Sequence, residues 1–181
     1  MSLLSSVELL ELVDQGVITN VDRGSINAAS IDVHLGTDFL IEKDCIYIKS
    51  RTPVLDLSKR EKPTMFGLKD FVILDPSEFC LASTVETFNM PDNISAQFML
   101  KSSIARSGLE HLMAGFIDSG FNNSVLTLEL INMLRYSRIM IKSGMAIGQV
   151  IFFKHTDVPE EFSYRNKGRY NGDKTVQEIK L

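Results

Sequence analysis

The chain has 181 residues, of which 44% are hydrophobic and 23% are charged, a composition typical of a globular protein and not of a disordered one. This length suffices for one well-buried core and is too short for two ordinary domains. The formal net charge of −4 and the isoelectric point near 5.4 argue against a general nucleic-acid or membrane surface. A local basic cluster can still hold an anionic small molecule.

The first residues alternate apolar and acidic side chains without a basic leader, and no run approaches the roughly 20 apolar residues of a membrane span. We therefore expect a soluble cytoplasmic protein. The two cysteines, Cys45 and Cys80, make no disulfide framework, and none of the three histidines has a metal-ligand spacing to them. The H-x-E and P-C-x-x-C signature of zinc deaminases is absent, so we expect no zinc.

Taken in chain order, one helix and many short strands are predicted. Residues 5–16 form the clearest helix, because Ser5 and Glu8 have the spacing of a capping box and Gly16 can end the helix. Short apolar or alternating runs predict strands at residues 30–36, 39–41, 45–48, 71–74, 97–100, 138–141 and around Gln149. Residues 50–63, charged and proline-containing, are predicted to form a surface loop. The pattern favours an all-β barrel or sandwich with a helix packed over the sheet.

Polar groups gather between Lys101 and Glu129. Residues 101–106 offer an ammonium group, hydroxyls, a guanidinium group and several backbone N–H groups. This set suits a phosphate chain, because phosphate oxygens accept charge-assisted hydrogen bonds. The alternative is a polar loop or helix start that binds nothing, since paired serines commonly cap helices.

Two carboxylates follow this segment. Asp118 comes after an apolar pair and before Ser119 and Gly120, where the chain is expected to turn. Over residues 125–131, the period of two puts Leu126, Leu128 and Leu130 on one face and Val125, Thr127, Glu129 and Ile131 on the other. Glu129 then lies either on a solvated face or in a pocket, where shielding from water would raise its pKa and suit it to shuttle protons.

Beyond Pro159 the chain becomes polar, with cations and aromatic residues around glycines at residues 164–172. This composition fits a flap, residues 160–181, that closes over a charged ligand. A frayed basic tail fits the composition equally well.

In this order, KSSIARSGL (101–109), AGFIDSGF (114–121) and LTLEL (126–130) resemble the core of the dCTP deaminase family, relatives of the trimeric dUTPases. The likeness continues in SIDVHLG (30–36), FCLASTVE (79–86), SGMAIGQVIF (143–152) and GRYNG (168–172). It implies a single dUTPase-like domain over residues 1–181. It also implies a distorted β-barrel or jelly roll with an N-terminal helix, assembled as a homotrimer with active sites between the subunits.

The resemblance also implies roles for individual residues. Glu129 matches the general acid/base that activates water for attack on C4 of cytosine and passes protons to the departing ammonia. Ser102 and Arg106 match residues that position this water and the base or phosphates, and Asp118 matches the carboxylate that holds the deoxyribose 3′-hydroxyl. The substrate-binding set further includes Lys101, Ser103, Ile104, Ala105, Thr127, Leu128, Gln149, Tyr164 and Arg169. Mg²⁺ is expected to arrive bound to the nucleotide phosphates, without a metal site made by the protein.

The sequence departs from the family pattern at several places. Lys101 stands where arginine is usual, Ser119 replaces a common proline, and Asp173 falls where a glutamine usually meets the phosphates. The span from Phe121 to Glu129 is one residue longer than in familiar members. We expect the extra residue in the turn at 122–123, although a shifted register would flip Glu129 to the other face.

Gly115 and Phe116 precede Ile117 and Asp118, as in bifunctional members that deaminate dCTP and then release diphosphate to give dUMP. The alternatives are a monofunctional dCTP deaminase that gives dUTP, a plain dUTPase that needs no acid/base at Glu129, and a non-catalytic nucleotide-binding regulator. The expected ligands are dCTP and dUTP, with dTTP as a candidate inhibitor.

Overall fold

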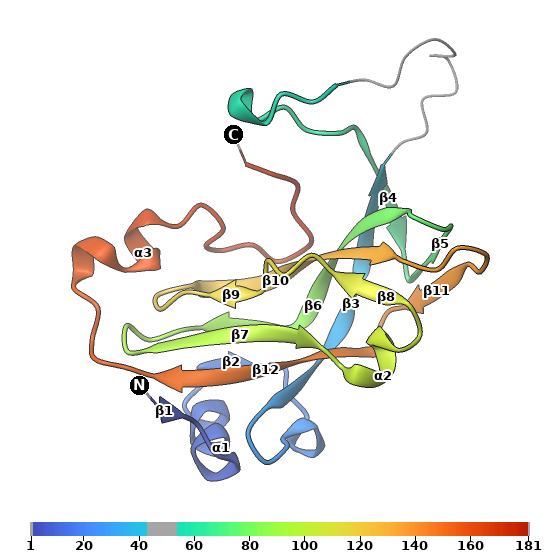
Figure 1. Cartoon of the computed structure of the whole chain (residues 1–181). Helices are drawn as coiled ribbons and strands as arrows, with labels where there is room; N and C mark the ends of the chain where they lie inside the picture. The colour runs from blue at the N-terminus through green and yellow to red at the C-terminus, as the bar shows by residue number, and fades with distance from the viewer. Residues whose placement is uncertain (1, 43–53, 181) are drawn as a thin grey trace.

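The structure of the chain is a computed structural model that describes residues 2–42 and 54–180 (Figure 1). The strand predicted at 45–48 and the start of the loop predicted at 50–63 lie outside the described residues. The strands are β1 (Ser2–Leu3), β2 (Ile18–Thr19), β3 (Ile31–Glu42), β4 (Met65–Lys69), β5 (Phe71–Leu74), β6 (Phe79–Asn89), β7 (Ile94–Leu100), β8 (Leu109–His111), β9 (Phe116–Ile117), β10 (Asn122–Asn132), β11 (Ile139–Lys142) and β12 (Ala146–Lys154). The helices are α1 (Ser6–Asp14), α2 (Ser102–Ala105) and α3 (Tyr164–Lys167), with 3₁₀ turns η1 (Arg23–Ser25), η2 (Leu57–Lys59) and η3 (Glu160–Phe162).

Most strands belong to one antiparallel sheet in the order β8-β10-β6-β3-β12-β7-β9, to which β1, β2 and β4 add short pairings. The sheet curls until β8, at one edge, meets β7 near the other. There the Phe98 ring packs edge-on against His111, with 4.8 Å between ring centroids. The curled sheet confirms the predicted all-β, distorted-barrel fold with an N-terminal helix.

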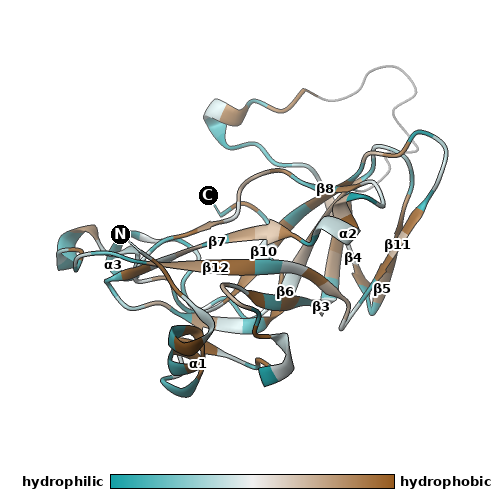
Figure 2. Ribbon diagram, turned by 60° about the horizontal axis from the view of Figure 1, so that its bottom comes forward, coloured by the Kyte–Doolittle hydropathy of each residue, from teal (hydrophilic) through white to brown (hydrophobic). Residues whose placement is uncertain are grey.

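The core lies inside the curled sheet. Its largest fully buried side chains include Phe39, Phe98 and Phe152 from three different strands, and Leu128 from β10 is 1% exposed. Figure 2 shows apolar stretches along the strands, whereas α3 is hydrophilic. Burial of this apolar surface is the main force that holds the curl closed.

Helix α1 covers one end of the sheet, as predicted (Figure 1). The Ser5 backbone N–H donates to Glu8 Oε2 at 2.9 Å, which is one half of a capping box. Leu9 and Leu12 are the buried residues of the helix, and Gly16 follows it with φ of +75°. Among the described residues, no helix is both long and apolar enough to span a bilayer.

A bulge near the start of β10 determines which side chains reach the site. In the pairing with β6, Asn122 lies opposite Asn89 and Ser124 opposite Phe88, so Asn123 is an extra residue on β10. Asn123 adopts φ of +53°, which asparagine tolerates better than most residues. The bulge falls in the turn where the sequence predicted an extra residue.

Candidate active site

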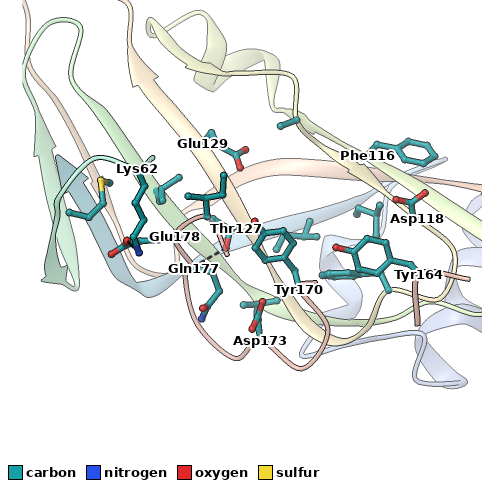
Figure 3. A pocket seen from close by; sticks show the side chains of 18 of the residues that line it. Lys62, Phe116, Asp118, Thr127, Glu129, Tyr164, Tyr170, Asp173, Gln177 and Glu178 are labelled. Atoms are coloured by element: carbon teal, nitrogen blue, oxygen red, sulfur yellow. Dashed lines mark hydrogen bonds and ion pairs between the residues drawn. The ribbon is translucent and has the colours of Figure 1, made fainter. Parts of the chain in front are cut away.

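A pocket of about 460 Å³ lies between β10, the segment after β9 and the C-terminal residues. Figure 3 shows an elongated site with Phe116, Asp118 and Tyr164 at one end and Lys62 and Glu178 at the other. Thr127 and Glu129 lie between the two ends. Of the residues predicted from sequence, the pocket therefore gathers Asp118, Thr127, Glu129 and Tyr164.

Strand β10 supplies the middle of the pocket. Beyond the bulge the strand alternates as predicted, with Leu128 and Leu130 buried in the core and Thr127 and Glu129 lining the pocket. A second register shift between Val125 and Thr127 lets Val125 and Leu126 both touch the pocket. Glu129 thus lines the pocket, with 28% of its side chain exposed.

The carboxylate of Glu129 has one buried oxygen and an otherwise partly accessible side chain. Oε2 lies 3.4 Å from Nε2 of His111, and 28% of the Glu129 side chain is exposed, against 5% for His111. Both atoms are buried and make no hydrogen bond to any other group among the described residues. The histidine lies on β8, where it pairs directly with Leu130 of β10.

Asp118 follows β9 at the other end of the pocket, at the turn that the sequence predicted. Burial raises the pKa of this carboxyl above its ordinary range. The turn continues through Gly120, whose φ of +85° and close approach to Ser163 Oγ leave no space for a side chain. Burial also raises the pKa of the neighbouring Tyr164 phenol.

The C-terminal residues lie across β10 and form one wall of the pocket (Figures 1 and 3). The Asp173 carbonyl accepts from the Val125 N–H at 2.9 Å, and the Gln177 N–H donates to Thr127 Oγ1 at 3.1 Å. Val176 is only 7% exposed. These contacts contradict the interpretation of the segment as a frayed tail.

Charge in this pocket is predominantly negative. Asp118, Glu129, Asp173 and Glu178 line it, whereas Lys62 is the single cation among its described lining residues. The Lys62 ammonium is 2.5 Å from Glu178 and so is already paired. Asp173 is paired with Lys180 at 2.6 Å. Among the residues that the structure describes, the pocket of this chain therefore lacks free cations for a phosphate chain.

The other predicted site residues lie outside this pocket. Ser102, Ser103, Ala105 and Arg106 are exposed in and beside α2, and Ile104 is half-buried. Lys101 forms an ion pair with Asp32, and Gln149 accepts a hydrogen bond from Ser30 Oγ at 3.2 Å. Arg169 is exposed, and Leu128 belongs to the core. A single chain thus separates the predicted catalytic carboxylates from the predicted phosphate-binding segment.

Sequence reasoning missed several residues of the site. His111, which no sequence motif marks as a site residue, is the buried neighbour of Glu129. Ser124, 0% exposed, contacts the C-terminal segment through its hydroxyl, and Lys62 comes from the predicted surface loop. The alternation of residues along β10 could have indicated that Ser124 faces inward. No local sequence pattern, in contrast, predicts that Lys62 contacts Glu178. Within residues 2–42 and 54–180, no group of three His, Cys, Asp or Glu side chains is placed to hold a metal ion.

Comparison with known proteins agrees with these features. A protein of Nocardioides sp., "dCTP deaminase, dUMP-forming", is 37% identical over 180 residues, which cover 95% of this chain and 91% of the relative. The protein of the same name from Methanosphaerula palustris is 31% identical over 177 residues, covering 90% of this chain and 91% of that one.

Among solved structures, 2′-deoxycytidine 5′-triphosphate deaminase from Agrobacterium tumefaciens has a similar fold, with a TM-score of 0.61 and 20% identity. The match covers 83% of this chain and 47% of that one, so this chain spans about half of its length. The family model described as dCTP deaminase-like matches residues 3–155, which include Glu129 on β10 and Asp118 after β9. The chain therefore belongs to the dCTP deaminase-like family.

Proposed function

We propose that this protein deaminates dCTP and then releases diphosphate, so that dCTP and two molecules of water give ammonia, dUMP and diphosphate. The observation that carries the proposal is the position of Glu129, a carboxylate in the middle of the pocket with one buried and one accessible side. The names of the relatives, dCTP deaminase, dUMP-forming, support the choice of substrate and product.

In the deamination step, a water molecule attacks C4 of cytosine while Glu129 takes a proton from it. The same carboxyl group then gives the proton to the exocyclic nitrogen, and the C4–N bond breaks to release ammonia. The proton that remains on the C4 hydroxyl moves to N3, so that uracil forms and Glu129 is left in its ionised form. Such proton transfer by one positioned side chain typically accelerates a reaction by about 10²- to 10⁴-fold. No metal-bound hydroxide is needed in this step, because the carboxylate itself activates the water.

Asp118 is proposed to bind the deoxyribose 3′-hydroxyl from its end of the pocket. The distribution of side chains in Figure 3 supports this assignment, because Asp118 and Tyr164 lie together and away from the Lys62 end. In the second step the same carboxylate helps to activate the water that attacks the α-phosphate of dUTP. Thr127 and Leu128 lie on the strand whose backbone would read the pyrimidine edge.

The negative pocket supports a homotrimer with shared sites. A nucleotide triphosphate needs several cations or amide donors, and the described lining of one subunit offers only the paired Lys62. Lys101, Ser102, Ser103 and Arg106 would come from α2 of the adjacent subunit, with the N–H groups of Ile104 and Ala105. Gln149 and Arg169 are proposed to contact the phosphates once the subunits are assembled. Mg²⁺ enters as part of the nucleotide substrate, and the protein is proposed to be cytoplasmic.

Residues 1–181 are proposed to form a single dUTPase-like domain in which residues 160–181 close over the nucleotide. The candidate inhibitor is dTTP.

The decisive experiment incubates the purified protein with dCTP and magnesium and follows nucleotides by chromatography alongside ammonia. The proposal predicts dUMP, diphosphate and ammonia in equal amounts. Accumulation of dUTP would show that the protein is a monofunctional deaminase. Hydrolysis of added dUTP without ammonia release from dCTP would show that it is a plain dUTPase.

A further inference from the structure

The least explained feature beside the pocket is a buried pair of polar atoms that lack hydrogen bonds. His111 Nε2 and Glu129 Oε2 are 3.4 Å apart, and neither finds another partner among the described residues. A buried polar atom without a partner costs about 1–3 kcal/mol, so two such atoms facing one another are best explained as partners of each other. The 3.4 Å separation is slightly longer than the 2.7–3.2 Å of an ordinary N–H···O bond, so a hydrogen bond requires the two side chains to approach each other.

The two side chains are held in place from several directions. His111 pairs with Leu130 across the ladder between β8 and β10, and the Leu112 N–H donates to the Glu129 carbonyl at 3.3 Å. The Phe98 ring packs edge-on against the imidazole where the sheet curls closed. His111 therefore has little freedom to turn away from Glu129, and its surroundings supply no competing acceptor for Nε2 within the described structure.

We infer that His111 is a positioning residue for Glu129: its Nε2–H donates to Oε2 and leaves Oε1 as the oxygen that exchanges protons with water and substrate. This inference rests on the proposed deamination. His111 is 5% exposed and does not line the pocket, so it acts through the carboxylate and does not touch the nucleotide. The assignment requires that Nε2 of the imidazole carry a proton.

Holding one carboxylate oxygen has a defined kinetic consequence. A general acid/base must stay within hydrogen-bond reach of the atoms that gain and lose the proton, and misplacement by about 1 Å can lower a rate about 100-fold. Substrate binding depends instead on groups along the rest of the pocket. Loss of the histidine should therefore lower kcat for ammonia release and leave KM for dCTP nearly unchanged.

The test compares His111→Leu, His111→Gln and the control His155→Leu. Glutamine can place an amide N–H close to the position of Nε2, whereas leucine cannot. His155 bonds Ser95 Oγ at 2.9 Å at the distant end of β12, so its replacement controls for loss of a histidine as such. Each protein is assayed for ammonia release from dCTP, for hydrolysis of added dUTP, and for Tm.

The inference predicts that His111→Leu lowers kcat for ammonia release by about 10- to 100-fold with less than about a 3-fold change in KM. Hydrolysis of dUTP should stay near the wild-type rate, and His111→Gln should recover at least about 5-fold of the loss. Unchanged ammonia release in His111→Leu, or a parallel loss of both reactions that glutamine does not repair, would overturn the inference alone. If the wild-type protein releases no ammonia from dCTP, the proposed function is overturned as well. The wild-type assay therefore distinguishes failure of the proposed function from failure of the role inferred for His111.

Discussion

The hydroxyl of Ser124 is the clearest structural link between β10 and the C-terminal segment. It accepts from the Gly172 N–H at 2.7 Å and from the Asp173 N–H at 3.3 Å, and it lies within 2.9 Å of the Tyr170 carbonyl. Ser124→Ala removes these bonds without adding bulk at a residue that is 0% exposed. Because the Gly172 N–H also reaches the Asn122 carbonyl at 3.1 Å, part of its bonding survives. We expect a loss of about 1–3 kcal/mol in the docking of the segment.

This free energy corresponds to roughly a 5- to 140-fold rise in the opening equilibrium of the segment, at about 1.4 kcal/mol per factor of ten. Hydrogen exchange measured by mass spectrometry on peptides from residues 164–180 reports that rise directly. Peptides from β3 and β12 serve as internal references. Ser95→Ala is the matched control, because among the described residues the Ser95 hydroxyl bonds His155 and no residue of 164–180.

Equal exchange of residues 164–180 in wild type and Ser124→Ala would refute the reasoning, because the segment would then be held by other contacts. Faster exchange throughout the sheet, in step with the C-terminal peptides, would also contradict it, since the segment would not open independently. If the segment closes over the nucleotide, Ser124→Ala should in addition raise KM for dCTP.

Three further predictions concern stability and assembly. Burial raises the pKa of Asp118, so Asp118→Asn should increase the free energy of unfolding at neutral pH. The gain should vanish below the ordinary pKa of about 3.9, where the carboxyl is protonated in both the folded and the unfolded state, and urea titrations at several pH values measure it. Gly120→Ala should destabilise the protein by about 1–3 kcal/mol in the same assay, because the new Cβ would lie 2.1 Å from Ser163 Oγ at a φ of +85°. Inactive Arg106→Ala and Glu129→Gln proteins, unfolded and refolded together, should regain up to about a quarter of wild-type ammonia release if each site combines two subunits. No recovery in the refolded mixture would contradict shared sites.

The strand that carries Glu129 could be predicted because its alternation is simple. One buried face of leucines fixes the register, and the bulge at Asn123 precedes the alternating residues 127–130. The turn at Asp118 was equally accessible, since Ser119 and Gly120 mark it. Local patterns sufficed wherever one strand or one turn set the position of a side chain.

The remaining features depend on contacts between distant segments. His111 meets Glu129 only because β8 pairs with β10, and a three-residue strand has too few positions to show a period. The ion pair of Lys62 with Glu178 joins a loop to the C-terminal segment. No local pattern in the sequence predicts this contact, because the two residues are far apart along the chain. Arg106 lies outside the pocket of the single chain. If each site is shared between subunits, as proposed, the geometry of one chain cannot complete it.

The measurement that tests the central claim most directly is ammonia release from dCTP by Glu129→Gln, with dCTP binding followed in parallel by calorimetry. Glu11→Gln, an exposed position on α1, is the control. The account predicts that Glu129→Gln loses at least about 100-fold in ammonia release while dCTP still binds, because the amide cannot accept the proton from water. Ammonia release near the wild-type rate would contradict the assignment of Glu129 as the general acid/base.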